Sequence, residues 1–368
     1  MSKMKKLIPT LLGIQSGEGV RASLMFLYAM FLLSAYLILK PVRNSLFLEK
    51  FGPQELVYMY MIIAVFAAVI ISAYTKVGAR LGLKKYITAT TLFLVTNLVA
   101  FWWLISQEYN WLVYVFYVWV SIFGAITTSQ FWLLANHIFD AREAKRLFPF
   151  IGAGAITGGI IGSKLTGLLA ETLGTEALLW ICVGFLALIQ TLLLLVWPLR
   201  AKDSLRGSAR KRMKDADTRG MWPLVFRDKY LRLLTGCIAL TVMVSTFVDF
   251  QFNWVVSETF EDKDARTAFF GDFFFYLSLL SLGMQLILSS RILRKFGVGA
   301  AILILPVGLL LGSAAIFTYP RLIWSAVLVK ISDGSFRYSI NKAGFELLYL
   351  PVASAIKNRV KGLMDVVG

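Results

Sequence analysis

Residues 22–44 read ASLMFLYAMFLLSAYLILKPVRN, and this stretch decides the fold. Its first 18 residues carry no charge, and a helix that crosses a bilayer needs roughly 20 mostly apolar residues. A charged side chain at the centre of a membrane costs about 3 kcal/mol, so cations near it usually face a protein interior, a water-filled path or an anion. We therefore predict a spanning helix that ends near Pro41, with Lys40, Arg43 and Asn44 as candidate anion-binding residues at that end.

Similar apolar runs recur along the chain, which is 58% hydrophobic. Backbone hydrogen bonding in lipid permits only helices or closed barrels, and these runs lack the polar–apolar alternation of barrel strands. The sequence therefore predicts an all-α polytopic membrane protein with about ten spanning helices. The predicted spans are 22–39, 55–74, 86–105, 111–136, 148–170, 177–198, 231–256, 268–290, 299–318 and 322–340.

Lysine and arginine gather in alternate loops: before the first span, between the second and third, and after the fourth. These cations include Lys3, Lys5, Lys6, Arg21, Lys76, Arg80, Lys84, Lys85, Arg142, Lys145 and Arg146. Lys and Arg are retained on the cytoplasmic side. The pattern predicts a multi-pass protein of the cell inner (plasma) membrane with a cytoplasmic N-terminus, and it accounts for the net charge of +17 without a nucleic-acid partner.

A basic segment at 200–230 interrupts the apolar pattern after six spans. It divides the chain into a predicted N-terminal six-helix bundle (1–199) and an incomplete C-terminal bundle of about four helices (231–368). The segment itself is interpreted as a cytoplasmic linker. It is either solvated or in contact with anionic lipid headgroups.

The two halves resemble each other at an offset of about 215 residues, as expected of a duplicated unit. Ser34–Ile38 corresponds to Ser245–Asp249, and Arg80–Leu83 corresponds to Lys295–Val298. This pattern predicts a major-facilitator-like fold of two pseudo-symmetric helical bundles. By the same comparison the last two of twelve helices are expected to be missing, because the chain is truncated or naturally short.

Charged residues inside the predicted tenth helix form one face. Lys330, Asp333 and Arg337 are spaced at i, i+3 and i+7. Together with Lys164 in the fifth helix and the cations at 40 and 43, they could meet the phosphates of an anionic substrate in a central cavity. The alternative is that Asp333 pairs with one of the cations, while the residues at 40 and 43 extend to the membrane interface.

The seventh predicted helix carries Asp249, close to Gln251 and Asn253. A structural ion pair, proton coupling and direct substrate contact are all possible for this acid. In the fifth helix, Gly154, Gly158 and Gly162 recur every four residues, which predicts close packing against a neighbouring helix.

Residue types required for chemistry are sparse. The sequence has one histidine and two cysteines, with no Ser or Cys partner for the histidine and no metal-ligand spacing. We therefore predict that the protein is not an enzyme and has no cofactor and no metal.

The loop GARLGLKK (78–85) resembles the short signature between the second and third helices of major facilitators, with Ala79 in place of the usual acid and Arg80 as a candidate gating residue. FWLLAN (131–136), DAREAKRLF (140–148) and IGAG (151–154) resemble the nucleotide transporter family, the ATP/ADP antiporters of plastids and intracellular bacteria with their free-living bacterial relatives.

The resemblance implies nucleotide exchange served by charged residues in four helices. Arg43 falls on the basic position and Asp249 on the acid of helix seven, whereas Ser121 and Phe345 stand where the family has an acid and a lysine. The remaining candidates are Asn136, Gln251 and Lys342 for substrate binding and Glu143 and Arg146 for gating or charge pairing.

These observations predict a secondary transporter that moves an anionic, phosphorylated solute, such as ATP or ADP by exchange, through alternating access. The alternatives are a transport-derived binding or sensor module without flux, and a major facilitator for another organic anion.

Overall fold

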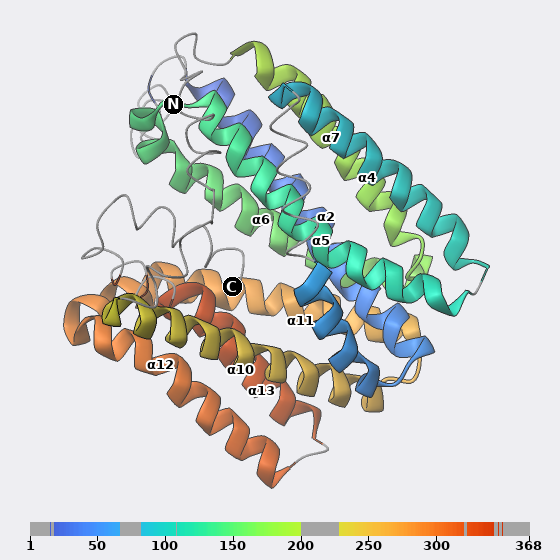
Figure 1. Cartoon of the computed structure of the whole chain (residues 1–368), viewed down its shortest axis with the longest axis vertical. Helices are drawn as coiled ribbons and strands as arrows, with labels where there is room; N and C mark the ends of the chain where they lie inside the picture. Colours follow the sequence, from blue (N-terminus) through green and yellow to red (C-terminus); the bar gives the residue numbers. More distant parts are fainter. Residues whose placement is uncertain are drawn as a thin grey trace, which may run out of the picture. The chain divides into compact units, whose positions relative to one another are not determined.

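The computed structural model describes residues 15, 18–66, 82–107, 109–199, 228–319, 322–341, 345 and 348. Regular structure in this part of the chain is helical throughout (Figure 1). Two compact units divide the chain: Met1–Arg210 with Glu261–Phe275, and Lys211–Phe260 with Tyr276–Gly368.

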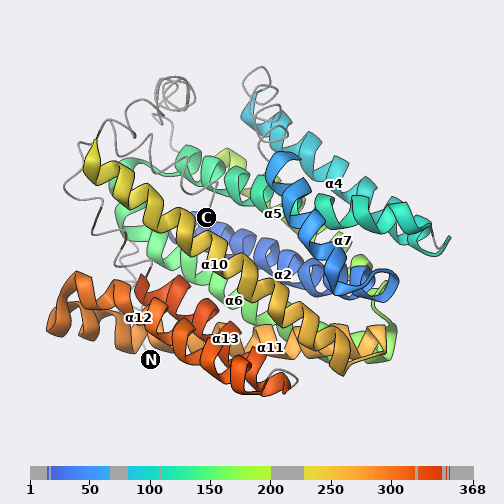
Figure 2. The ribbon, with the colours of Figure 1, turned by 60° about the horizontal axis from the view of Figure 1, so that its bottom comes forward.

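The first unit is built around α2 (Gly19–Lys50), which packs against α5 (Asn110–Ile138), α6 (Ala141–Leu173) and α7 (Leu178–Val196). The remaining long helix, α4 (Leu83–Ile105), lies along α7 (Figures 1 and 2). The core of this unit is apolar and aromatic, as expected for helices that bury one face against each other and expose the other to lipid. Its largest fully buried side chains include Tyr117, Phe47, Phe116, Phe123 and Phe139.

Glycines set the close contact between α2 and α6. A Cβ atom added at Gly154, Gly158 or Gly162 would lie 2.4, 2.0 or 2.4 Å from the backbone oxygen of Phe26, Met30 or Ser34, respectively. The same four-residue step thus occurs on both helices. Ser34 Oγ also donates a hydrogen bond of 2.9 Å to the Gly158 carbonyl. These contacts confirm the helix packing predicted from the glycine spacing.

A capping box begins α6. The Asp140 side chain accepts hydrogen bonds from the backbone N–H groups of Arg142 and Glu143, and the Glu143 carboxylate accepts one from Asp140 N. The backbone donors of Glu143 and Arg142 lower the pKa of the Asp140 carboxyl. Three backbone donors at the start of the helix, which have no partner within the helix itself, are therefore paired locally by side chains.

The second unit contains α10 (Lys229–Thr259), α12 (Ser290–Thr318) and α13 (Ile323–Phe336). Two π-helical segments, Met284–Ser289 and Arg337–Asn341, precede α12 and follow α13. The shortest of these helices, α13, packs against both α10 and α12 (Figures 1 and 2). A small apolar core joins them and consists of Val248, Leu305, Leu309 and Val329.

A further helix, α11 (Lys263–Gly283), begins in the first unit and ends in the second. The predicted division placed all of 231–368 in one bundle, whereas contacts assign Glu261–Phe275 to the first unit. The sequence could not predict to which unit Glu261–Phe275 belongs, because this depends on which helix the start of α11 packs against. Most of the predicted 200–230 linker lies outside the described residues.

Eight helices among the described residues are long and apolar enough to cross a membrane. They correspond to eight of the ten predicted spans. The prediction at 55–74 meets a shorter apolar helix, Pro53–Phe66, beyond which 67–81 lie outside the described part. The prediction at 322–340 meets α13, which has 14 residues and continues into the π-helical Arg337–Asn341.

The predicted end of the first helix near Pro41 is wrong. The helix continues through the proline to Lys50. Proline removes one backbone donor, but in a bundle the neighbouring helices can satisfy the carbonyl that this leaves. Lys40, Arg43 and Asn44 consequently lie within α2, away from its end.

Candidate functional site

Arg43 projects from α2 onto α5. Its NH1 group donates a hydrogen bond of 2.6 Å to Ser121 Oγ, and its Nε donates one of 3.1 Å to Asn44 Oδ1. The guanidinium also lies 4.4 Å from the ring centroid of Tyr117. Among the described residues, the structure gives Arg43 no carboxylate partner. Because its contacts are with neutral groups, its positive charge stays available to an anion.

The hydroxyl of Ser121 stands where the family resemblance places an acid, and the structure brings it to Arg43. An acid at this position would neutralise the guanidinium, whereas a serine provides one hydrogen bond without charge. The serine therefore contacts Arg43 without adding a negative charge.

Lys40 and Lys164 each contact α11 within the first unit. Lys40 Nζ lies 4.5 Å from the ring centroid of Phe274. Lys164 Nζ forms an ion pair of 3.0 Å with Asp272 Oδ1 and lies 5.2 Å from the ring centroid of Phe275. Both cations therefore lie against aromatic rings. Sequence reasoning missed Asp272, although an isolated acid in the aromatic run FFGDFFF (269–275) is the kind of intramembrane charge that marks a functional site.

Glycines allow α6 and α11 to approach at this point. A Cβ on Gly271 would lie 2.4 Å from Gly167 N, and one on Gly167 would lie 2.5 Å from Asp272 Oδ1. The contact between the two helices therefore positions the ion pair of Lys164.

The second unit contains a separate charged cluster between α10 and α13. Lys330 Nζ lies 2.5 Å from Asp249 Oδ1 and 3.4 Å from Asp333 Oδ2. Ser245 Oγ donates to Asp333 Oδ2 at 2.6 Å, and Arg337 NH1 donates to Ser245 Oγ. Lys330 and Asp333 are buried, and Asp333 does pair with a cation of its own helix face. The predicted face of helix ten thus forms one connected polar network.

Two further predicted substrate-binding residues lie within described helices. Asn136 donates to the Trp132 carbonyl in its own helix, and the Gln251 side chain is exposed on α10. Arg80 and Lys342 lie outside the described residues, and Phe345 is described as a single helical residue.

Two ion pairs join the starts of α2 and α6. Arg21 NH2 lies 2.6 Å from Glu143 Oε1, and Arg146 NH2 lies 2.7 Å from Glu18 Oε1. Burial opposes ionisation of Glu18, but hydrogen bonds from Arg146 and Gln15 N and the nearby arginine charges outweigh it and lower the pKa of this carboxyl. Glu143 and Arg146 are therefore both engaged in charge pairs.

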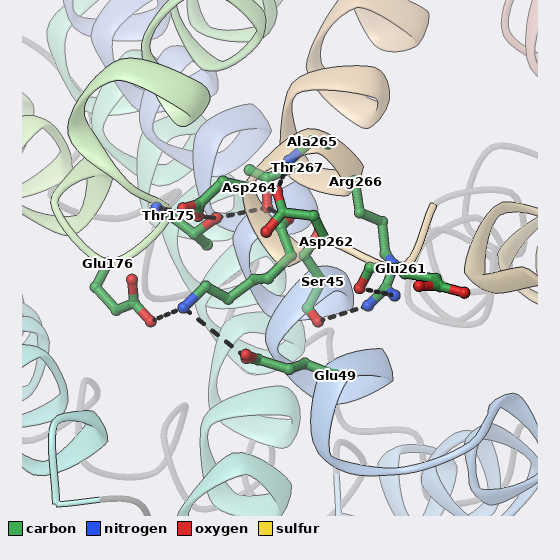
Figure 3. Close-up of polar contacts among 11 residues, drawn as sticks. Ser45, Glu49, Thr175, Glu176, Glu261, Asp262, Asp264, Ala265, Arg266 and Thr267 are labelled. Atoms are coloured by element: carbon green, nitrogen blue, oxygen red, sulfur yellow. Dashed lines mark hydrogen bonds and ion pairs between the residues drawn. The ribbon is translucent and has the colours of Figure 1, made fainter. Parts of the chain in front are cut away.

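A polar cluster that sequence reasoning missed surrounds the start of α11 (Figure 3). Lys263 Nζ lies 2.6 Å from Glu176 Oε1, in the loop between α6 and α7, and 3.9 Å from Glu49 Oε2 at the end of α2. The Asp264 carboxylate accepts hydrogen bonds from both the N–H (2.8 Å) and the hydroxyl (2.6 Å) of Thr175. We call Glu49, Thr175, Glu176, Lys263 and Asp264 the α11 clasp.

Arg266 adds a buried contact next to the α11 clasp. Its guanidinium donates to the carbonyls of Ser45 (3.4 Å) and Glu261 (3.2 Å), as Figure 3 shows. Beside Lys263 and Glu176 lies a pocket of about 150 Å³. Glu261, Asp262 and Asp264 stand out in the sequence only as a cluster of acids. The partner of Asp264 could not be predicted, because Thr175 lies 89 positions away in the loop between α6 and α7.

Residues 86–323 match the family described as TLC ATP/ADP transporter. The chain belongs to this family. The match covers more than half of the chain and confirms the resemblance seen in the sequence motifs. It also identifies the protein as a member of a family of multi-pass membrane transporters.

Curated relatives of this TLC family protein include ADP,ATP carrier protein 1 of Chlamydia trachomatis, which is 24% identical over 72% of this chain and 57% of that protein. ADP,ATP carrier protein 3 of Rickettsia bellii is 22% identical over 75% of this chain and 64% of the carrier. A chloroplastic ADP,ATP carrier protein 2 of Arabidopsis thaliana is 25% identical over 70% of this chain and 46% of its own length. The chain therefore spans less than two thirds of the length of these relatives.

Solved structures share the fold at low sequence identity. A point mutant of the nucleoside transporter NupG superposes with a TM-score of 0.67 at 14% identity, covering 94% of this chain and 87% of NupG. A D-xylose–proton symporter gives a TM-score of 0.61 at 17% identity, with coverage of 94% and 86%. These structures confirm the predicted major-facilitator-like fold.

Proposed function

We propose that this protein is a secondary transporter that exchanges nucleotides, with ATP and ADP as substrates, across the cell inner membrane. The observation that carries the proposal is the match of residues 86–323 to the TLC ATP/ADP transporter family. The relatives are named as ADP,ATP carriers, which agrees with an anionic, phosphorylated cargo and with the absence of an enzymatic role.

The cationic side chains of each unit supply the chemistry that such a cargo requires. Arg43 presents its guanidinium to Ser121 Oγ and the Tyr117 ring, so a phosphate oxygen can replace a neutral partner without breaking an ion pair. In the second unit Lys330 and Arg337 belong to one network. We assign substrate contact to Lys40, Arg43 and Lys164 in the first unit and to Lys330 and Arg337 in the second.

One observation favours a second candidate, the transport of another organic anion. The family resemblance places an acid at Ser121 and a lysine at Phe345, and the side chains at these positions are neutral. A changed charge pattern at the site is expected to change which anions bind best.

We also propose an orientation of the chain in the membrane. Lys and Arg in alternate loops favour a cytoplasmic N-terminus, and the basic 200–230 segment favours contact with anionic headgroups. Reporter fusions after residue 1 and within 200–230 should both report the cytoplasmic side.

Exchange is tested with the purified protein in proteoliposomes. We expect uptake of labelled ATP to require ADP inside the vesicles, and we expect Arg43→Ala to reduce it strongly. Lys50→Ala, which removes an exposed cation at the end of the same helix and outside the proposed site, serves as the matched control. Binding of phosphorylated solutes without any flux would instead support a sensor, and flux of a different anion alone would support the second candidate.

A further inference from the structure

Two carboxylates share the buried ammonium of Lys330, and they differ in exposure. Asp333 is 2% exposed and is fixed by a hydrogen bond from Ser245. Asp249, on α10, lies closer to Lys330 Nζ, at 2.5 Å, yet its side chain is 36% exposed. The nearer of the two acids is therefore also the one that can be reached from outside the network.

Lys330 cannot remain without a close anion. It is 5% exposed, and a buried charge that loses its partner keeps the whole cost of its desolvation. If Asp249 moves away, Lys330 keeps only Asp333, at 3.4 Å, and a second anion at the vacated position would restore its closer partner. A phosphate oxygen accepts the same charge-assisted hydrogen bond from an ammonium as a carboxylate oxygen does.

The rest of the network is arranged to stay in place during such a replacement. Asp333 keeps Lys330 through Oδ2, while its Oδ1 is buried and accepts no hydrogen bond from the described residues. This second oxygen can receive one of the three N–H donors of Lys330. Arg337, linked to Asp333 through Ser245, adds a second cation on the same helix face.

We propose that Asp249 is a resident counter-anion that competes with a phosphate group of the substrate for Lys330, and that it thereby determines specificity. This inference rests on the proposed function only in taking a phosphorylated anion as the cargo. A ligand must replace a carboxylate at 2.5 Å, so a phosphate dianion is favoured over a singly charged anion, which gains little by the exchange.

Binding of inorganic phosphate and pyrophosphate to the full chain in detergent tests the proposal. Asp249→Asn keeps the shape of the side chain and removes the competing charge, so it should bind both probes about tenfold more tightly than the wild type. It should also bind acetate measurably, because a singly charged anion no longer has to replace the Asp249 carboxylate. Glu258→Gln, the same acid-to-amide change in a residue of α10 bonded to Trp254, is the control and should leave affinity unchanged.

A double-mutant cycle separates competition from a merely structural role. In a Lys330→Gln background, Asp249→Asn should bring no gain in phosphate affinity, since there is no ammonium left to compete for. Equal or weaker phosphate binding by the single variant, with an unchanged melting temperature, would overturn the proposal, and so would a gain that persists without Lys330.

Infrared spectroscopy provides a measurement that needs no change at Asp249. With ¹³C-labelled aspartate, phosphate binding to the wild type should shift an aspartate carboxylate band, and Lys330→Gln should abolish this shift. An unchanged aspartate spectrum on saturation with phosphate would refute the exchange of anions. Failure of ATP/ADP exchange in proteoliposomes would leave these binding results standing, so the two proposals can fail separately.

Discussion

Replacement of Gly158 by alanine should weaken the packing of α2 against α6. The added Cβ would lie 2.0 Å from the Met30 carbonyl oxygen, against 3.4 Å for ordinary van der Waals contact, so the helices must separate by about 1.4 Å. The clashing atom belongs to the backbone of α2, which cannot move to another rotamer as a side chain can. Overpacking of this kind costs about 1–3 kcal/mol.

The same separation weakens the hydrogen bond from Ser34 Oγ to the Gly158 carbonyl, which is 2.9 Å long and buried. Hydrogen bonds between membrane helices average about 0.6 kcal/mol. Alanine also raises helix propensity by about 1 kcal/mol relative to glycine, which offsets part of the loss. We therefore expect Gly158→Ala to lower the free energy of unfolding by about 1–2 kcal/mol.

Gly152→Ala is the matched control, because it lies in the same helix and its Cβ would meet nothing within 4 Å. Both variants gain the same propensity, so the difference between them isolates packing and should be about 2–3 kcal/mol. Unfolding of the detergent-solubilised protein, followed by tryptophan fluorescence or circular dichroism, measures it. Equal midpoints for the two alanine variants would refute the argument from helix approach.

Three other perturbations test the charged groups. Arg43→Ala should weaken ATP binding about 10- to 100-fold in equilibrium titration, since one charge-assisted hydrogen bond contributes about 1.5–3 kcal/mol; unchanged affinity would remove Arg43 from the site. Lys263→Met should lower stability by about 1 kcal/mol in thermal unfolding by breaking its pair with Glu176, whereas Lys295→Met should not. Because the pKa of Glu18 is lowered in the folded protein, its stabilising effect is complete above the ordinary pKa, about 4.3, and is lost as pH falls through the lowered value. Glu18→Gln should therefore weaken the pH dependence of the unfolding midpoint over that interval. An identical pH dependence in the variant and the wild type would contradict the assignment.

The membrane class, the position of most helices and the glycine packing surface could all be predicted because each depends on local sequence. Hydropathy over about 20 residues reports the solvent of a segment, and a four-residue glycine repeat reports one face of one helix. The i, i+3, i+7 spacing of Lys330, Asp333 and Arg337 placed those residues together for the same reason. Helix geometry brings such residues onto one face whatever the rest of the chain does.

Partner choice among charged residues could not be predicted in this way. The pairs Lys164–Asp272 and Lys263–Glu176 join residues about a hundred positions apart, and the crossing and rotation of the helices decide which side chains meet. The continuation of α2 through Pro41 likewise depends on neighbouring helices, since an isolated segment would tend to end or kink there. The sequence by itself determined that this protein is a helical membrane protein that resembles the nucleotide transporter family and carries cations in or beside its apolar segments. Only the tertiary structure decided that Arg43 meets a hydroxyl and a ring while Lys330 is held between two carboxylates, because those contacts arise from the packing of whole helices.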